Sequence, residues 1–212
     1  MSRTPSSHRS RHKSLGTMMV GAKAEPKETD EHYDTPTEGT LAFLYAERRH
    51  IQAHGDWVWE CACGRGAMAR VLGADGFNVH ATTLRDRGWG KTGVDFLKTR
   101  SLTGLPRTII TNPPFSQTDA FIRHAHILGA DYLALLLPST FFQATARAGR
   151  DDLQQLYPPS LHLPLGFRLD FERKGAPVMS CSWFVWDRNR PGNPSFMKTS
   201  PALRKPEIGG MK

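Results

Sequence analysis

Apolar residues in the middle of the chain form short runs separated by segments with helical spacing. The runs cover residues 57–60, 77–82, 108–111 and 132–137, and each is bounded by polar turns, which is typical of buried strands. Helical patterns lie between them, at about 41–51, 67–72 and 118–128. Strands that alternate with helices predict an α/β fold with a doubly wound, mostly parallel sheet. Two later runs, at 161–171 and 180–186, predict a final antiparallel pair.

Turn signals mark where the predicted helices begin. Residues 35–38 read Thr-Pro-Thr-Glu, a capping box with proline in the first helical position. A glycine-rich turn at residues 63–66 leads from the first strand into the next helix. Doubly wound sheets bind ligands beyond the carboxyl ends of their strands. Glu60 and Asn112 both lie at the carboxyl ends of predicted strands, so we expect them to share one site.

The two ends of the chain differ in composition from its middle. Residues 1–30 are rich in Ser, Arg, Lys and Pro and lack periodicity, so we expect a disordered basic tail. Residues 189–212 resemble them and are predicted to form a Pro-rich basic tail. Residues 31–188 are left as a single domain, with enough length for a sizeable core.

Charge and cysteine content narrow the class of protein. The net charge is +8 and the pI is about 9.7, which favours a nucleic-acid partner, DNA first and RNA second. Much of this charge lies in the tails, so a solubilising role for them stays open. No apolar run approaches the ~20 residues of a membrane helix, and we expect no membrane association. Three cysteines indicate reduced thiols in a cytoplasmic protein, and Cys61 and Cys63 lack the partners of a zinc site, so no metal is expected.

The segment 111–115, Thr-Asn-Pro-Pro-Phe, carries the clearest chemical signal. Two prolines fix two φ angles and remove two backbone donors, and the residue before them is pushed toward an extended conformation. The turn therefore offers the amide oxygen of Asn112 and rigid carbonyl groups to one planar amino group. Phe115 is placed to stack on the ring that bears this group. Methyl transfer to an amino nitrogen is the leading function for such an arrangement.

An acidic residue and a glycine-rich turn stand at the end of the first strand. Glu60 is followed by Gly64 and Gly66, which permit close approach of the backbone to a ligand. The carboxylate of Glu60 suits a cationic amine or a hydroxyl. The turn matches neither the dinucleotide-binding fingerprint nor a phosphate-binding loop, because Ala69 replaces the last glycine and no Gly-Lys-Ser/Thr ending follows.

Together, these motifs resemble the S-adenosylmethionine-dependent amino-methyltransferases of the class I Rossmann-like fold. The likeness is greatest to small phage- and prophage-type adenine-N6 DNA methyltransferases, whose Asn-Pro-Pro-Tyr/Phe motif matches residues 112–115. It implies a catalytic turn made of Asn112, Pro113, Pro114 and Phe115. It also implies a set of cofactor-binding residues: Tyr33, Thr35, Pro36, Glu60, Cys61, Gly64, Gly66, Thr83, Asp86, Asp95, Phe96 and Asn112.

One position departs from this family pattern. The second strand of the fold ordinarily ends in an acidic residue that binds the ribose hydroxyls of the cofactor, and Thr83 stands there in this chain. Asp86 follows three residues later and is the alternative ribose ligand.

Three functions are compatible with the motifs. The first is an adenine-N6 DNA methyltransferase, in which residues 139–159, with Arg147 and Arg150, are the candidate for target recognition. The second has the same chemistry on another planar amino group, in an RNA base or a protein glutamine. The third is a nucleic-acid-binding relative without turnover. Neither the acceptor nor the oligomeric state follows from the sequence.

Overall fold

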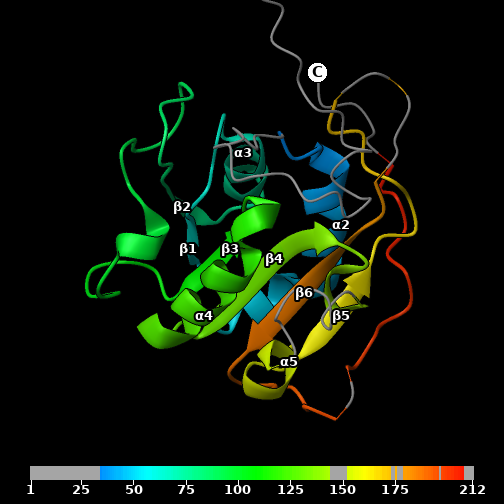
Figure 1. Ribbon diagram of the computed structural model, residues 1–212. Coiled ribbons are helices and arrows are strands. Elements are labelled where there is room, and N and C mark those ends of the chain that lie inside the picture. The colour runs from blue at the N-terminus through cyan, green and yellow to red at the C-terminus, as the bar shows by residue number, and fades with distance from the viewer. Residues whose placement is uncertain (1–33, 144–151, 173–174, 176–178, 196, 208–212) are drawn as a thin grey trace, which may run out of the picture. The chain divides into compact units, whose positions relative to one another are not determined.

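The computed structural model describes residues 34–143, 152–172, 175, 179–195 and 197–207. Its central element is a six-stranded sheet in the order β2-β1-β3-β4-β6-β5 (Figure 1). The strands are β1 (Trp57–Glu60), β2 (Asn78–Ala81), β3 (Thr108–Thr111), β4 (Tyr132–Pro138), β5 (Leu161–Pro164) and β6 (Cys181–Asp187). The first four strands pair in parallel, and β6 is antiparallel to both β4 and β5. The predicted α/β fold with a mostly parallel sheet and an antiparallel end is confirmed.

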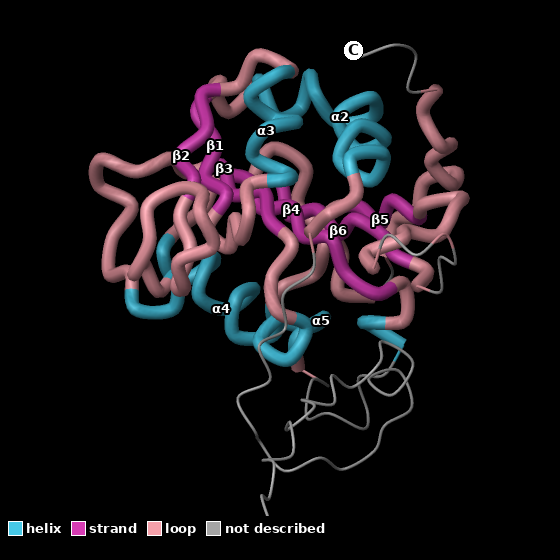
Figure 2. Tube along the Cα trace, turned by 90° about the horizontal axis from the view of Figure 1, so that it is seen from above, coloured by secondary structure: helices cyan, strands magenta, loops and turns pink. Residues whose placement is uncertain are grey.

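Helices cover both faces of this sheet. Viewed along it, α2 (Thr37–Gln52) and α3 (Ala67–Ala74) lie on one side, and α4 (Thr118–Leu128) and the short α5 (Leu153–Leu156) lie on the other (Figure 2). The strands in the middle of the sheet are therefore covered on both faces. This explains why β3 and β4 read as continuous apolar runs rather than as alternating patterns.

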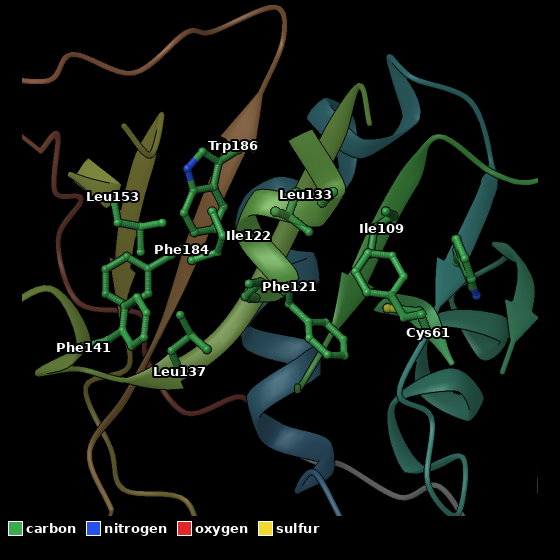
Figure 3. Packing of buried hydrophobic residues seen from close by; sticks show 14 of the residues in the cluster. Cys61, Ile109, Phe121, Ile122, Leu133, Leu137, Phe141, Leu153, Phe184 and Trp186 are labelled. Atoms are coloured by element: carbon green, nitrogen blue, oxygen red, sulfur yellow. The ribbon is translucent and has the colours of Figure 1, made fainter. Parts of the chain in front are cut away.

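The core beneath α4 holds this helix against the sheet. Phe121 and Ile122 point from α4 toward Ile109 of β3 and Leu133 of β4, and all four side chains are buried (Figure 3). Burying a large apolar side chain contributes about 1.5–3 kcal/mol relative to its exposure. The helix that follows residues 111–115 is thus fixed, and with it the exit of that turn.

On the opposite face, aromatic and polar contacts fix α2. Phe43 stacks on Trp183 of β6 with ring centroids 4.2 Å apart, and the indole nitrogen of Trp183 donates to the carbonyl of Gly39 at 3.0 Å. Glu47 is buried and accepts from the hydroxyl of Tyr132 at 3.0 Å and from the guanidinium of Arg190. These contacts set the position of α2 relative to the sheet.

The start of α2 differs from the predicted capping box. The helix begins at Thr37, Pro36 occupies the N-cap position, and no side chain of the described residues caps the first turn. The hydroxyl of Thr35 instead accepts a hydrogen bond from Asn112. The sequence pattern predicts a local cap, but the Thr35 side chain that would supply it is hydrogen-bonded to Asn112, which follows the end of β3.

Part of the segment predicted as the Pro-rich C-terminal tail lies along β5. The amide of His162 donates to the carbonyl of Lys198 at 2.8 Å, and the amide of Leu203 donates to that of Pro164 at 2.7 Å. Backbone pairing of this kind needs no apolar periodicity, and Pro201 falls between the paired residues.

Among the helices that the structure describes, none is long and apolar enough to span a bilayer.

Candidate active site

Polar side chains gather at the carboxyl ends of β1 and β3. Glu60 ends β1, Thr111 ends β3, and Asn112 follows directly. Because these strands are parallel neighbours, their carboxyl ends meet at one edge of the sheet. The hydroxyl of Thr111 donates to Oε1 of Glu60 at 2.5 Å, and both residues are buried.

A cavity opens at this edge. Its lining combines residues from the segment before α2, the end of β1, the glycine-rich turn, the first turn of α3 and the end of β3: Asp34, Thr35, Glu60, Ala62, Cys63, Gly64, Ala67, Met68 and Asn112. The structure thus brings together four residues predicted for one site, namely Thr35, Glu60, Gly64 and Asn112.

The carboxamide of Asn112 has one end engaged and one end available. Its Nδ2 atom donates to the hydroxyl of Thr35 at 3.2 Å. Its Oδ1 atom is buried and has no hydrogen-bond partner among the described residues. A buried acceptor without a donor costs about 1–3 kcal/mol. A ligand that brings an N–H group to this oxygen would recover that free energy.

Glu60 carries the strongest electrostatic signature of the cavity. Burial raises its pKa to about 8, although hydrogen bonds from Thr111 and the amide of Ala62 act in the opposite direction. Its Oε2 atom is buried without a partner among the described residues. Without a bound cation, Glu60 is therefore mainly the neutral acid at neutral pH. A bound cation would favour its ionised form.

The proline turn is rigid and leads directly into α4. Pro113 is buried, and the carbonyl of Pro114 accepts from the amide of Gln117 at 2.9 Å. This bond closes a short 3₁₀ turn, η2 (Phe115–Gln117), just before α4. The ring of Phe115 is half-buried and packs against the core cluster under α4. The turn thus has little freedom to move relative to the sheet.

The glycine-rich turn uses its two glycines differently. Gly64 has a φ of 52° and lines the cavity. Gly66 has a φ of 77° and stands at the N-cap of α3, where a Cβ atom would lie 2.2 Å from Cδ1 of Trp89. Gly66 therefore makes room for an indole of the same chain. Ala67 and Met68 bring the amino end of α3, with its positive dipole, to the cavity wall.

The remaining predicted cofactor residues stand apart from the cavity lining. Cys61 and Phe96 are buried in the core cluster, where Phe96 packs against Trp59 and Phe121. Pro36 caps α2. Tyr33 lies outside the described residues.

Three further polar residues predicted to bind the cofactor make local contacts outside the cavity lining. Asp95 accepts from the amide of Leu97 at 3.1 Å and so caps the 3₁₀ turn η1 (Phe96–Lys98). Asp86 accepts from the amide of Gly88 at 2.9 Å within a surface turn. Thr83 is buried, and its backbone pairs with Lys91 and Val94.

Five residues of the cavity wall were not predicted as site residues: Asp34, Ala62, Cys63, Ala67 and Met68. Cys63 is the first residue of the glycine-rich turn itself, and the other four are neighbours in sequence of the motifs, which is the signal that could have found them. Burial, and then the nearby Glu60, raise the pKa of the Cys63 thiol to about 12. It stays protonated at neutral pH and is no nucleophile.

Two further predictions concern recognition and metals. Arg147 and Arg150, of the predicted target-recognition segment 139–159, lie outside the described residues. Within the described part of the chain, no three His, Cys, Asp or Glu side chains are arranged to hold a metal ion.

Comparison with known proteins gives structural neighbours only. No known family and no curated protein matches the sequence. A solved structure proposed to be an RNA methyltransferase of Pyrococcus horikoshii matches 77% of this chain and 89% of its own, with a TM-score of 0.55 and 14% identity. A structure proposed to be a class I S-adenosylmethionine-dependent methyltransferase of Listeria monocytogenes matches 90% and 68%, with a TM-score of 0.53 and 14% identity.

A third neighbour is the methyltransferase subunit of a type I restriction-modification system from Streptococcus thermophilus. It aligns over 76% of this chain with a TM-score of 0.50 and 13% identity, and the chain spans 46% of its length. At such identities the likeness concerns the fold alone. The chain has the α/β fold, with a mostly parallel sheet, that these methyltransferases share.

Proposed function

We propose that this protein is an S-adenosylmethionine-dependent methyltransferase that acts on an exocyclic amino group, with adenine N6 of DNA as the first candidate. One observation carries the proposal. Asn112, whose buried Oδ1 has no partner in the described part of the chain, and the buried acid Glu60 line the same cavity at the carboxyl edge of a class I-like sheet.

The cavity residues fit the methionine end of this cofactor. Glu60 is placed to bind the ammonium group, which would donate a hydrogen bond to Oε2, the atom without a partner in the described chain. The amino end of α3, at Ala67 and Met68, favours the carboxylate, since no acidic residue stands in the first turn of this helix. Thr83 and Asp86 are the candidates for the ribose hydroxyls, and Asp95 and Phe96 for the adenine. When bound, the cofactor supplies an electrophilic methyl group on a sulfonium.

The proline turn would activate the acceptor. An exocyclic amine conjugated with its ring is a weak nucleophile. Hydrogen bonds from its NH₂ group to Oδ1 of Asn112 and to the carbonyl of Pro113 draw the lone pair out of conjugation. The same bonds stabilise the positive charge that develops on nitrogen. Phe115 holds the plane of the ring. A strong base is unnecessary before attack, because the methylated ammonium is acidic and loses its proton to water afterwards.

The charge of the chain supports a nucleic-acid acceptor. The net charge of +8 suits a polyanion, and two of the structural neighbours are named for RNA methylation and for restriction-modification. A base within duplex DNA would have to flip out of the stack to reach Asn112. An RNA base or a protein glutamine offers the same planar NH₂ group and is the alternative acceptor.

Labelled methyl transfer tests the proposal. The full chain is incubated with methyl-labelled cofactor and separate pools of DNA, RNA and protein, and cofactor binding is measured by calorimetry. Label in DNA that is lost in Asn112→Ala supports the first candidate. Label in RNA or protein instead supports the same methyl-transfer chemistry on the alternative acceptor. Cofactor binding without transfer to any pool, or no cofactor binding, contradicts the enzyme assignment.

A further inference from the structure

The loop after β2 is closed at its base by backbone hydrogen bonds. The amide of Lys91 donates to the carbonyl of Ala81, and the amide of Thr83 donates to that of Lys91, both at 2.9 Å. The amide of Val94 then donates to the carbonyl of Thr83 at 3.2 Å. Residues 84–90 are thereby held at both ends and form a compact surface loop of the type that often carries function.

This loop combines positive charge with exposed apolar side chains. Residues 84–91 contain three cations, Arg85, Arg87 and Lys91, against one acid, Asp86. Leu84 is 55% exposed and Trp89 is 39% exposed. Cationic groups interleaved with apolar and aromatic side chains suit a nucleic acid, which offers phosphates and flat bases together.

Trp89 ties the loop to the glycine-rich turn. Its indole lies against Gly66, and the guanidinium of Arg70 stands 4.6 Å from the centroid of its ring, which adds a fourth cation to this surface. At Gly90 a Cβ atom would lie 2.8 Å from both the carbonyl oxygen of Ala81 and the thiol of Cys63, so the backbone is closely packed there as well. The backbone of the loop is thus packed closely against the glycine-rich turn of the candidate active site.

The loop lies at the same edge of the sheet as Asn112. It follows the carboxyl end of β2, and only β1 separates β2 from β3. With strands about 4.8 Å apart, the base of the loop is on the order of 10 Å from the end of β3. Phosphates of one strand of a duplex follow each other every ~3.4 Å along the axis. A nucleic acid with one base at Asn112 therefore has phosphates within reach of the loop.

We propose that residues 84–91, with Arg70, form a contact surface for the sugar-phosphate backbone of a nucleic acid whose target base enters the cavity at Asn112. This rests on the proposed function only for the identity of the cavity as the reaction site. The surface itself binds nucleic acid whether or not methyl transfer follows.

Salt-dependent binding of labelled oligonucleotides tests this surface. Fluorescence anisotropy is measured with single-stranded and duplex oligonucleotides over a salt series. Each phosphate contact contributes about 0.7 to the slope of log K against log salt for single strands and about 0.9 for duplex. Arg85→Ala/Arg87→Ala should lower the slope by about 1.4 or 1.8 respectively and weaken binding at low salt. Arg85→Lys/Arg87→Lys should keep the slope.

A matched control removes the same charge at the other edge of the sheet. Arg49 in the last turn of α2 and Arg188 after β6 are both exposed there. Arg49→Ala/Arg188→Ala should lower the slope of log K against log salt much less than the loop variant does. Equal slopes for the two alanine variants, or a wild-type chain that binds no oligonucleotide, would overturn the proposal. Methyl transfer is scored separately, so a wild type that binds nucleic acid through the loop but methylates nothing contradicts the proposed function alone.

Discussion

The side-chain amide of Asn112 hydrogen-bonds to the hydroxyl of Thr35, 77 residues earlier in the chain, at 3.2 Å. This contact joins the proline turn after β3 to the segment that enters α2. The α2 helix is itself anchored to β6 by the stack of Phe43 on Trp183. The nitrogen end of the carboxamide is thus occupied by a fixed partner, while Oδ1 of this cavity-lining residue is buried and has no partner among the described residues.

Thr35→Val should therefore lower turnover more than it lowers cofactor affinity. Valine keeps the shape but offers Asn112 no acceptor, and loss of one hydrogen bond of about 0.5–1.5 kcal/mol corresponds to a decrease of up to about tenfold in kcat. Thr35→Ser retains the hydroxyl and should retain most of the rate. Steady-state kinetics and calorimetry on the three proteins check this. A serine variant as slow as the valine variant would show that shape, rather than the hydrogen bond, matters at this position.

Asn112→Ala should abolish most methyl transfer while cofactor affinity stays nearly intact. Loss of one preorganised group that stabilises developing charge typically lowers kcat by about 10²- to 10³-fold. The buried neighbours Glu60 and Thr111 keep their own hydrogen bond in the variant. Single-turnover methylation and calorimetry give the two quantities. A parallel loss of both would place Asn112 in cofactor binding instead of acceptor activation.

Much of the sheet was predictable because its strands are buried on both faces. Residues 108–111 and 132–137 show continuous apolar character for this reason, and both runs match β3 and β4 within one residue. The strand predicted at 161–171 was less accurate, since β5 ends at Pro164. Proline has no amide hydrogen for the ladder, and Gly166 follows closely, so regular pairing stops although the apolar pattern continues.

The site was predictable where it depends on strand ends and less so where it depends on packing. Glu60 and Asn112 come together because adjacent parallel strands end at one edge. The sequence does not reveal that the ring of Phe96 turns into the core against Trp59, or that Trp89 lies on Gly66. Both contacts join segments that have no shared local pattern.

Cofactor affinity should depend on pH through Glu60. Its pKa of about 8 without a bound cation means that the carboxyl is mainly protonated below pH 8 and must lose this proton when an ammonium group binds. Affinity should therefore rise by up to about tenfold per pH unit between pH 6 and pH 8, with release of up to about one proton. At higher pH the α-amino group of the cofactor loses its charge in turn, and affinity should fall.

Calorimetry in buffers of different ionisation enthalpy counts the released proton. Glu60→Gln removes the titrating group, so it should bind the cofactor more weakly, release no proton and show no rise in affinity between pH 6 and pH 8.

The stability of the protein without cofactor should change with pH in the opposite direction. The folded state holds the proton more tightly than the unfolded chain, so Glu60 lowers the free energy of unfolding as pH rises from about 4.5 to about 8. The glutamine variant should lack this decline, and an identical decline in both proteins would contradict the assignment.

Gly66→Ala should destabilise the protein through Trp89, and Gly88→Ala is its matched control. Both glycines have nearly the same φ, 77° and 78°, so alanine meets the same left-handed strain of about 1–2 kcal/mol at each. A Cβ at position 66 would lie 2.2 Å from the indole of Trp89, whereas a Cβ at position 88 would meet no atom of the described neighbouring residues within 4 Å. The cost at 66 should exceed that at 88, and the excess should disappear in a Trp89→Ala background. Denaturant unfolding of the double-mutant cycle measures it, with a coupling of about 0.5–3 kcal/mol expected for residues in contact. Equal costs at the two glycines would mean that the indole is free to leave Gly66.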